Sequence, residues 1–239
     1  MKYLDLSLPD PASNLACDEA LIEFFESTDA ADGLLRIWES ENHFVVLGHS
    51  NRIDSEVNLA ACEFEQVPIL RRLSGGGTVL QGPGCLNYTL ILRNHIDVPA
   101  TIGESFQFVL EHHKRCIQQM TGSHVAIDGV SDLVIEGQKF SGNAQYRKRR
   151  FALLHGTFLL NLNLAMIERI LQIPSKQPEY RKNRSHEDFV KNLHLEPSEV
   201  RRGLRKAWHA GDPFLHVPKA RIAELVKNRY GNPGWTRKF

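Results

Sequence analysis

Strand-like apolar runs fill the middle of the chain, and helical patterns lie mainly toward its two ends. Residues 34–40 (LLRIWES), 43–50 (HFVVLGHS) and 85–93 (CLNYTLILR) are rich in β-branched, aromatic and leucine side chains. Turn-forming residues separate several of these runs, as at Gly82-Pro83-Gly84. A regular strand–helix–strand alternation is missing from the sequence. The order therefore predicts an α+β fold rather than a doubly wound one.

Helical periodicity is clearest at residues 13–27 and 102–121. In the first segment Ser13 or Asn14 can cap an apolar stripe. The second begins near Thr101 and is amphipathic. Both segments predict helices that cover a sheet.

A predicted hairpin occupies residues 132–147 and turns at Glu136-Gly137. Another strand is expected over 151–162, and a short helix over 164–172. These elements place several polar residues on neighbouring strands.

Bulk properties narrow the class of protein. A length of 239 residues suits one sizeable domain, and a net charge of +1 favours neither nucleic acid nor a membrane as partner. The four cysteines show no CxxC spacing, and no HExxH motif or run of about 18 apolar residues occurs in the sequence. We therefore expect a cytoplasmic protein with reduced thiols.

Two arginines and three consecutive glycines stand together in the segment 71–78 (RRLSGGGT). Glycines expose backbone N–H groups to a close ligand, and arginine carries permanent positive charge. A flexible hairpin loop beside a surface charge is the alternative interpretation. The segment lacks the GK[ST] ending of a P-loop and continues as a strand. It predicts a binding site for a phosphate or carboxylate.

Two further polar residues interrupt strand-like runs. Alternation puts Lys139 on the face opposite Phe140, where an ammonium can polarise a carbonyl or neutralise a phosphate. An ordinary exposed lysine has the same spacing. His155 lies within an apolar run, where a structural histidine is the more common case.

Taken together, these segments resemble the lipoate-protein ligase A family, within the superfamily of biotin and lipoate ligases and octanoyltransferases. The resemblance spans about residues 10–190. Its pieces are VLGHSN at 46–51, RRLSGGGTV at 71–79, LNYTLIL at 86–92, SDLVIEGQKFSGNAQ at 131–145 and HGTFLLN at 155–161. It implies a mixed, largely antiparallel sheet flanked by helices, as in class II aminoacyl-tRNA synthetase and biotin/lipoate ligase catalytic domains. It also implies a single catalytic domain over 1–239, with a core at about 10–195 and a short helical tail at about 196–239 instead of a full accessory domain.

The family's activity would be ATP-dependent conversion of lipoate or octanoate to an acyl-adenylate, followed by transfer to a carrier lysine. ATP and Mg²⁺ would be co-substrates, and no cofactor would be permanently bound. Lys139 matches the family's essential lysine, and Asp132 matches an acidic position near adenine and Mg²⁺. Residues implied in substrate or nucleotide binding are Arg71, Arg72, Ser74, Gly75, Gly76, Gly77, Thr78, Asp132, Ser141, Gly142, Ala144, His155 and Gly156. Candidates for an acyl tunnel are Leu35, Val45, Val46 and Leu73.

The implied partner is a lipoyl carrier domain, such as a 2-oxoacid dehydrogenase E2 subunit, a glycine cleavage H protein or a related lipoate-binding protein. A separately encoded accessory protein is a further expected partner, while nucleic acid and membrane are not. The basic segment 180–193 is a candidate to cover the nucleotide or receive an acidic carrier.

Some positions depart from the family pattern. Gln81-Gly82 replace a common His-Asp pair, Ser131 replaces a common Asn, and His49 stands where Arg is common. These changes bear on nucleotide and acyl preference.

The main alternative is an octanoyltransferase of the same fold, which uses a cysteine nucleophile and no ATP. Residues 123–131, where one branch carries that cysteine, contain none, and no cysteine follows Cys116. Cys85 is the remaining candidate near the glycine segment. A non-catalytic lipoate-binding homologue is a second candidate function, and a biotin ligase, whose glycine-arginine loop differs from RRLSGGG, is a third.

Overall fold

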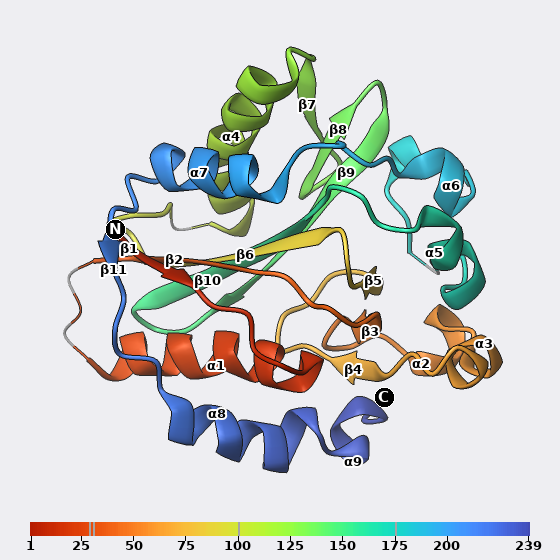
Figure 1. Cartoon of the computed structure of the whole chain (residues 1–239), viewed down its shortest axis with the longest axis horizontal. Coiled ribbons are helices and arrows are strands. Elements are labelled where there is room, and N and C mark those ends of the chain that lie inside the picture. Colours follow the sequence, from red (N-terminus) through yellow and green to blue (C-terminus); the bar gives the residue numbers. More distant parts are fainter. Residues whose placement is uncertain (29, 31, 100, 175) are drawn as a thin grey trace.

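The computed structural model describes residues 1–28, 30, 32–99, 101–174 and 176–239. An eight-stranded sheet runs through its centre in the order β11-β1-β2-β6-β10-β9-β8-β7 (Figure 1). Its strands are β1 (Lys2–Asp5), β2 (Leu34–Trp38), β6 (Cys85–Arg93), β7 (Val125–Asp128), β8 (Asp132–Ile135), β9 (Gln138–Arg147), β10 (Phe151–Leu159) and β11 (Asp212–Pro213). Strand β1 pairs in parallel with both neighbours, and the sheet from β2 to β7 is antiparallel. The predicted α+β class and mixed, largely antiparallel sheet are confirmed.

A smaller sheet of order β4-β3-β5 lies beside the large one. It contains β3 (Phe44–Leu47), β4 (Ile69–Arg71) and β5 (Val79–Gln81). Strand β3 pairs in parallel with β4 and antiparallel with β5. The glycine segment therefore crosses over β3 to join β4 to β5, instead of closing a hairpin between them. The strands predicted before and after Glu39 to Asn42 also belong to different sheets.

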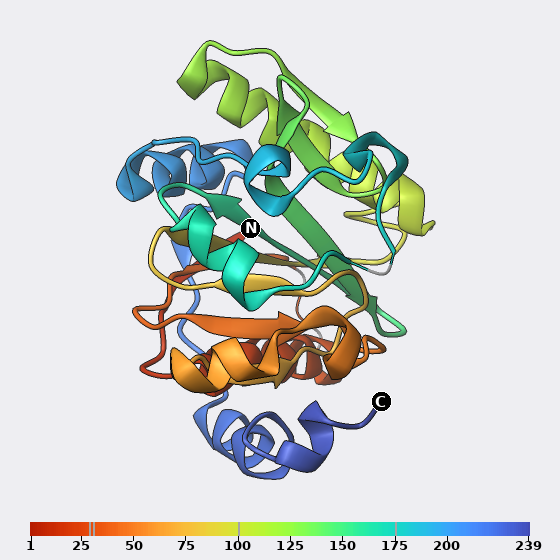
Figure 2. The ribbon, with the colours of Figure 1, turned by 90° about the vertical axis from the view of Figure 1, so that its right-hand side faces the viewer.

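Helices cover both faces of the large sheet (Figures 1 and 2). On one face α1 (Pro11–Ser27) and α8 (Lys219–Leu225) share an apolar cluster with Leu34 and Leu153. On the other, α4 (Ile102–Thr121) and α7 (Pro197–Ala207) pack on Leu35 and Leu154. Adjacent strand residues enter opposite clusters because side chains alternate along a strand. None of the described helices is long and apolar enough to cross a membrane.

Short elements complete the fold, most of them around the small sheet. They are α2 (Ile53–Glu56), α3 (Leu59–Phe64), α5 (Leu164–Ile170), the 3₁₀ turn η1 (Glu179–Arg181), α6 (His186–Phe189), the π-helical turn η2 (Val226–Tyr230) and α9 (Pro233–Thr236).

The helix starts show which sequence signals decide. Thr101 caps α4 as predicted, because its hydroxyl accepts the Glu104 N–H at 3.2 Å. The prediction for α1 was wrong by one turn, since Asp10 accepts the Ser13 N–H at 2.8 Å. Asn14 is inside the helix, and its amide pairs with the backbone of Leu8.

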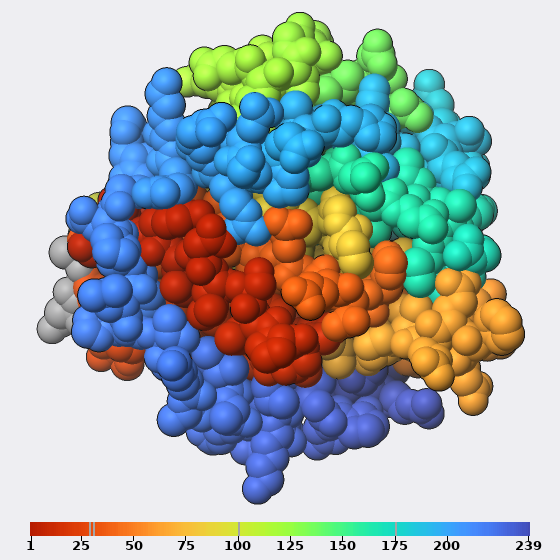
Figure 3. Space-filling model, viewed as in Figure 1, coloured from red at the N-terminus to blue at the C-terminus, as the bar shows by residue number. Residues whose placement is uncertain are grey.

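The C-terminal residues from 197 onward are integrated into the molecule. Helix α7 contacts α4, β11 extends the large sheet beside β1, and α8 contacts α1. In the space-filling view this blue segment passes around the red N-terminal region (Figure 3). The expected tail is helical for most of its length and contributes to both apolar clusters of the large sheet.

Candidate active site

Arg72 holds the loop between β4 and β5. Its Nη2 donates to the carbonyls of Gly75 at 2.6 Å and Gly77 at 2.8 Å, and its Nε donates to Ser74 Oγ at 3.0 Å. Burial lowers the pKa of Arg72 to about 10, so the side chain is cationic at neutral pH. All of these partners are neutral oxygens. A buried cation with neutral partners attracts an anion.

Arg71, next in the sequence, has a different environment. Its guanidinium donates to main-chain carbonyls of residues 48–51 and to those of Trp235 and Thr236. The side chain thus ties the loop after β3 to the C-terminal segment. This geometry gives Arg71 a positioning role.

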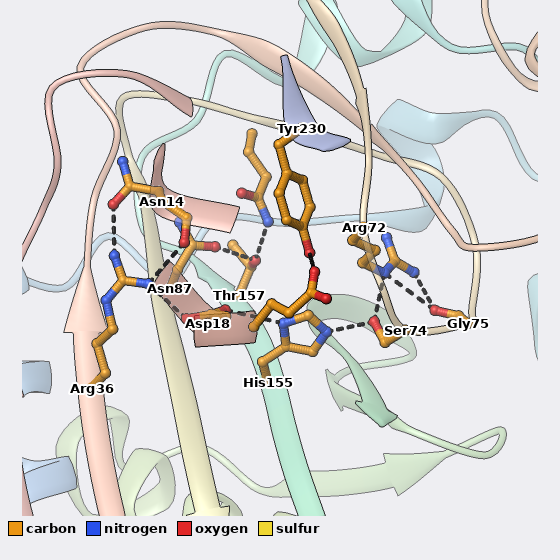
Figure 4. Close-up of polar contacts among 12 residues, drawn as sticks. Asn14, Asp18, Arg36, Arg72, Ser74, Gly75, Asn87, His155, Thr157 and Tyr230 are labelled. Atoms are coloured by element: carbon orange, nitrogen blue, oxygen red, sulfur yellow. Dashed lines mark hydrogen bonds and ion pairs between the residues drawn. The ribbon is translucent and has the colours of Figure 1, made fainter. Parts of the chain in front are cut away.

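A chain of hydrogen bonds links the glycine loop to α1. Ser74 Oγ lies 2.6 Å from His155 Nε2, and His155 Nδ1 lies 3.4 Å from Asp18 Oδ2 (Figure 4). Arg36 Nη1 donates to Asp18 Oδ1 at 2.6 Å. The acidic neighbour favours the His155 tautomer with its proton on Nδ1, so that Nε2 accepts the Ser74 hydroxyl proton. The loop is thereby anchored at a defined position over β10.

Burial by itself would raise the pKa of Asp18, but the adjacent Arg36 guanidinium outweighs it and holds that pKa below its usual value. Asp18 is therefore ionised at neutral pH. The resulting pair is almost fully buried, with side-chain exposures of 0% for Arg36 and 7% for Asp18.

A narrow cavity lies beside this chain of hydrogen bonds. It is lined from α1, the β4–β5 loop, β9, β10 and the C-terminal segment. The lining residues are Leu15, Asp18, Glu19, Arg72, Leu73, Ser74, Tyr146, Leu153, His155 and Tyr230. Apolar side chains and convergent polar groups together are typical of a ligand cavity.

Lys139 reaches the same side of the sheet through a β-bulge. The register of β8 and β9 shifts between Leu133 and Val134, so that β9 contains one extra residue. Phe140 then faces the cluster under α4, while Lys139 Nζ lies 2.7 Å from Asp132 Oδ1. Lys139 faces away from Phe140, as its prediction required.

Asp132 orients this lysine and is itself held in place. Tyr180, from the segment that follows α5, donates its hydroxyl to Asp132 Oδ2 at 2.7 Å. The basic side chains near it serve the same cover: Arg184 donates to the carbonyls of Gly137 and Tyr180, and Arg181 to that of Arg184. The predicted basic segment therefore lies over the β8–β9 turn.

The glycine loop and Lys139 occupy neighbouring positions on one face of β9. A Cβ atom at Gly76 would lie 3.7 Å from the Ala144 Cβ, and one at Gly142 would lie 2.7 Å from Lys139 Nζ. Residues 142 and 144 are two positions apart, about 7 Å along a strand. His155 pairs with Ala144 across the strands and shares that face. Loop, lysine and histidine thus border one surface.

Two of the residues implied by the family pattern lie behind this surface. A Cβ atom at Gly156 would overlap Asn143 Oδ1 at 1.9 Å, and Asn143 Nδ2 approaches Ser141 Oγ at 3.4 Å. Asn143 also accepts the Tyr88 hydroxyl, on the α4 side of the sheet. Ser141 and Gly156 therefore support the strands from the opposite face, because alternation and the bulge turn them away from His155.

The tunnel candidates separate in the same way. Leu73 lines the cavity. Leu35 belongs to the cluster under α4 and Val45 to that of the small sheet, so the structure contradicts a lining role for both. Val46 lies in the cluster under α1. Thr78 accepts the Asn51 amide at 3.1 Å and joins the two loops.

The cysteines lie away from this surface and are buried. Cys85 belongs to the small-sheet cluster, and burial raises the pKa of its thiol to about 12. A thiol with such a pKa contains almost no thiolate at neutral pH.

Sequence reasoning missed Asp18, Glu19, Arg36 and Tyr230. The available signal was the polar pair Asn14 and Asp18, four residues apart in an apolar helix, which places both on one face. Their partners lie 18 to 137 positions away and become neighbours only through the sheet.

A mixed sheet that carries an arginine-anchored glycine loop and a strand lysine on one face defines the class of biotin- and lipoate-handling ligases and transferases. Residues 10–201 match the family model of the lipoyl protein ligase A/B catalytic domain. The chain belongs to this family.

Relatives carry two kinds of names. Octanoyltransferase LipM of Halalkalibacterium halodurans is 23% identical over 270 residues, which cover 98% of this chain and 97% of the relative. Lipoate-protein ligase LplJ of Bacillus subtilis is 25% identical over 252 residues, which cover 98% of this chain and 73% of the relative. A solved bi-partite lipoate protein ligase from Thermoplasma acidophilum has the same fold, with a TM-score of 0.82, 22% identity, and coverage of 99% of this chain and 95% of that one.

Proposed function

We propose that the chain is a lipoate-protein ligase. It activates lipoate or octanoate with ATP and transfers the acyl group to a lysine of a lipoyl carrier domain. The carrying observation is the shared face of β9, where a cationic loop anchored by buried Arg72 borders the Lys139 ammonium. The names of LplJ and of the Thermoplasma ligase support the same activity.

The chemistry requires two kinds of group. A carboxylate is a poor acyl donor, and a mixed anhydride with AMP supplies a good leaving group. Arg72 and the exposed glycine amides bind the carboxylate or α-phosphate oxygens. Lys139 stabilises the charge that grows on the acyl carbonyl and the departing phosphate. Asp132 positions that lysine through its 2.7 Å contact.

Magnesium enters as a companion of ATP. Both Asp132 oxygens already accept hydrogen bonds, from Lys139 and Tyr180. In the described parts of the chain no three His, Cys, Asp or Glu side chains are grouped to hold a metal. These residues do not fit a protein-held ion, so Mg²⁺ is expected to be coordinated by nucleotide phosphates and water.

The cysteines favour a ligase over an octanoyltransferase with a thiol nucleophile. Cys85, the candidate nearest the glycine loop in sequence, is fully buried, and its thiol pKa is about 12. The burial of Cys17 raises its thiol pKa to about 11. Neither thiol lines the cavity.

The proposed acyl acceptor is a lipoyl domain, as in an E2 subunit or an H protein. The Thermoplasma ligase was studied together with its E2 lipoyl domain. Its bi-partite nature makes a separately encoded accessory protein part of the proposal.

The test is a mass shift on purified lipoyl domains, with and without such an accessory protein. Incubation with ATP, Mg²⁺ and lipoate or octanoate should add one acyl group and release pyrophosphate. Transfer from octanoyl-carrier protein without ATP, and none from the free acid with ATP, would contradict the ligase and favour the transferase. Absence of both reactions, with lipoate still bound, would indicate a binding homologue.

A further inference from the structure

The C-terminal segment 226–239 docks onto the cavity from outside the part of the chain that matches the family model. The Tyr230 hydroxyl donates to Glu19 Oε2 at 2.7 Å, and the Arg229 guanidinium pairs with the same carboxylate. Glu19 is 4% exposed and Tyr230 1% exposed. A buried carboxylate with two such partners fixes the position of the tyrosine well enough to shape a wall.

A second attachment holds the other end of the segment. Arg71 Nη2 donates to the Thr236 carbonyl at 2.7 Å, and Trp235 Nε1 donates back to the Arg71 carbonyl at 2.9 Å. The segment is therefore clamped to α1 at one end and to β4 at the other.

Exposure distinguishes a mouth from a closed end in the cavity. Leu73, Tyr146 and His155 are half-buried, whereas Leu153 is buried and packs under α1. Tyr230 enters opposite the mouth, beside His155 in the view of Figure 4. Its ring belongs to the apolar cluster that includes Leu15 and Leu153. Since the cavity is narrow, a side chain of this size decides how much apolar chain fits behind the polar groups.

We propose that Tyr230 is the end wall of the acyl cavity and sets the length of acyl chain that the protein accepts. This rests on the proposed function in one respect, namely that an acyl tail occupies the cavity. The carboxyl end lies near Arg72 and Ser74, and the tail runs toward the Tyr230 ring. Pockets of this kind discriminate by about 10- to 200-fold for small changes in apolar size.

The experiment compares saturated acids of eight, ten and twelve carbons in the full-length protein. Binding is measured by calorimetry without ATP, and ligation by the mass shift with ATP. In Tyr230→Ala the ratio of twelve-carbon to eight-carbon affinity should rise about 10-fold. Tyr230→Trp should shift preference in the opposite direction, toward shorter acids. Tyr230→Phe keeps the ring and should leave the ratio within about two-fold.

Phe214→Ala is the matched control, because Phe214 belongs to the same apolar cluster and lies outside the cavity lining. An unchanged ratio in both Tyr230→Ala and Tyr230→Trp overturns the proposal, as does an equal shift in Phe214→Ala. If Tyr230→Ala fails to fold, the Trp variant decides alone. Length-selective binding without ATP-dependent ligation would refute the proposed function and leave the wall intact.

Discussion

The two ends of the candidate site differ in how they are built. At the loop end, Arg36, Asp18, His155 and Ser74 form a buried chain of hydrogen bonds that continues to Arg72. At the lysine end, Lys139 retains 24% side-chain exposure and is paired with Asp132. Buried ion pairs are costly to break, whereas exposed pairs contribute little to stability. The comparison predicts that the loop end mainly holds the fold and the lysine end mainly serves the chemistry.

The largest expected effect follows from removing Arg36. Arg36→Met leaves the buried Asp18 carboxylate without its cation, so the free energy of unfolding should fall by about 3–5 kcal/mol. Denaturant titration measures this loss. Arg201→Met is the control, since Arg201 pairs with Asp5 and Glu39 nearer the surface and should lose about 1 kcal/mol or less. Equal losses would remove the distinction between buried and exposed pairs.

Lys139→Ala should act on the reaction instead of the fold. We expect kcat/KM for acyl transfer to fall by about 10²- to 10³-fold, because a charge that stabilises the transition state is lost. The midpoint of thermal unfolding should barely change. Lys191→Ala, which removes a nearby lysine paired with Glu136, should retain activity. Substantial transfer by Lys139→Ala would contradict the assigned role.

A pH series sharpens the contrast at Asp18. Its folded-state pKa is lower than its unfolded value, so ionised Asp18 stabilises the fold above about pH 4. That contribution disappears as the pH falls through the folded-state pKa. The difference in unfolding temperature between the wild type and Asp18→Asn should therefore be full at pH 7 and narrow below pH 4. A difference that stays constant down to pH 3 would show that the carboxylate charge is not involved.

The smallest effect is expected at Cys85. Cys85→Ala should keep acyl transfer within about two-fold and cost about 1 kcal/mol of stability, as typical for trimming a buried side chain. Transfer rates and denaturant titration test both numbers. Loss of transfer in a folded Cys85→Ala protein would instead identify a thiol-dependent transferase.

Local patterns predicted much of the fold. The amphipathic period of residues 102–121 matches the observed bounds of α4, and Glu136-Gly137 turn the β8–β9 hairpin as expected. The segment 53–64, for which no element was predicted, forms α2 and α3. These helices are four and six residues long, too short for a clear period.

The sequence by itself determined the α+β class, the glycine loop beside two arginines and the strand lysine, because residue type and period act over a few neighbours. Only the tertiary structure decided that Arg72 anchors the loop while Arg71 binds the C-terminal segment. It also decided that a bulge turns Lys139 toward the loop and that Tyr230 reaches the cavity. Strand register, one extra residue in β9 and contacts across more than 100 positions control these outcomes, and no local pattern encodes them.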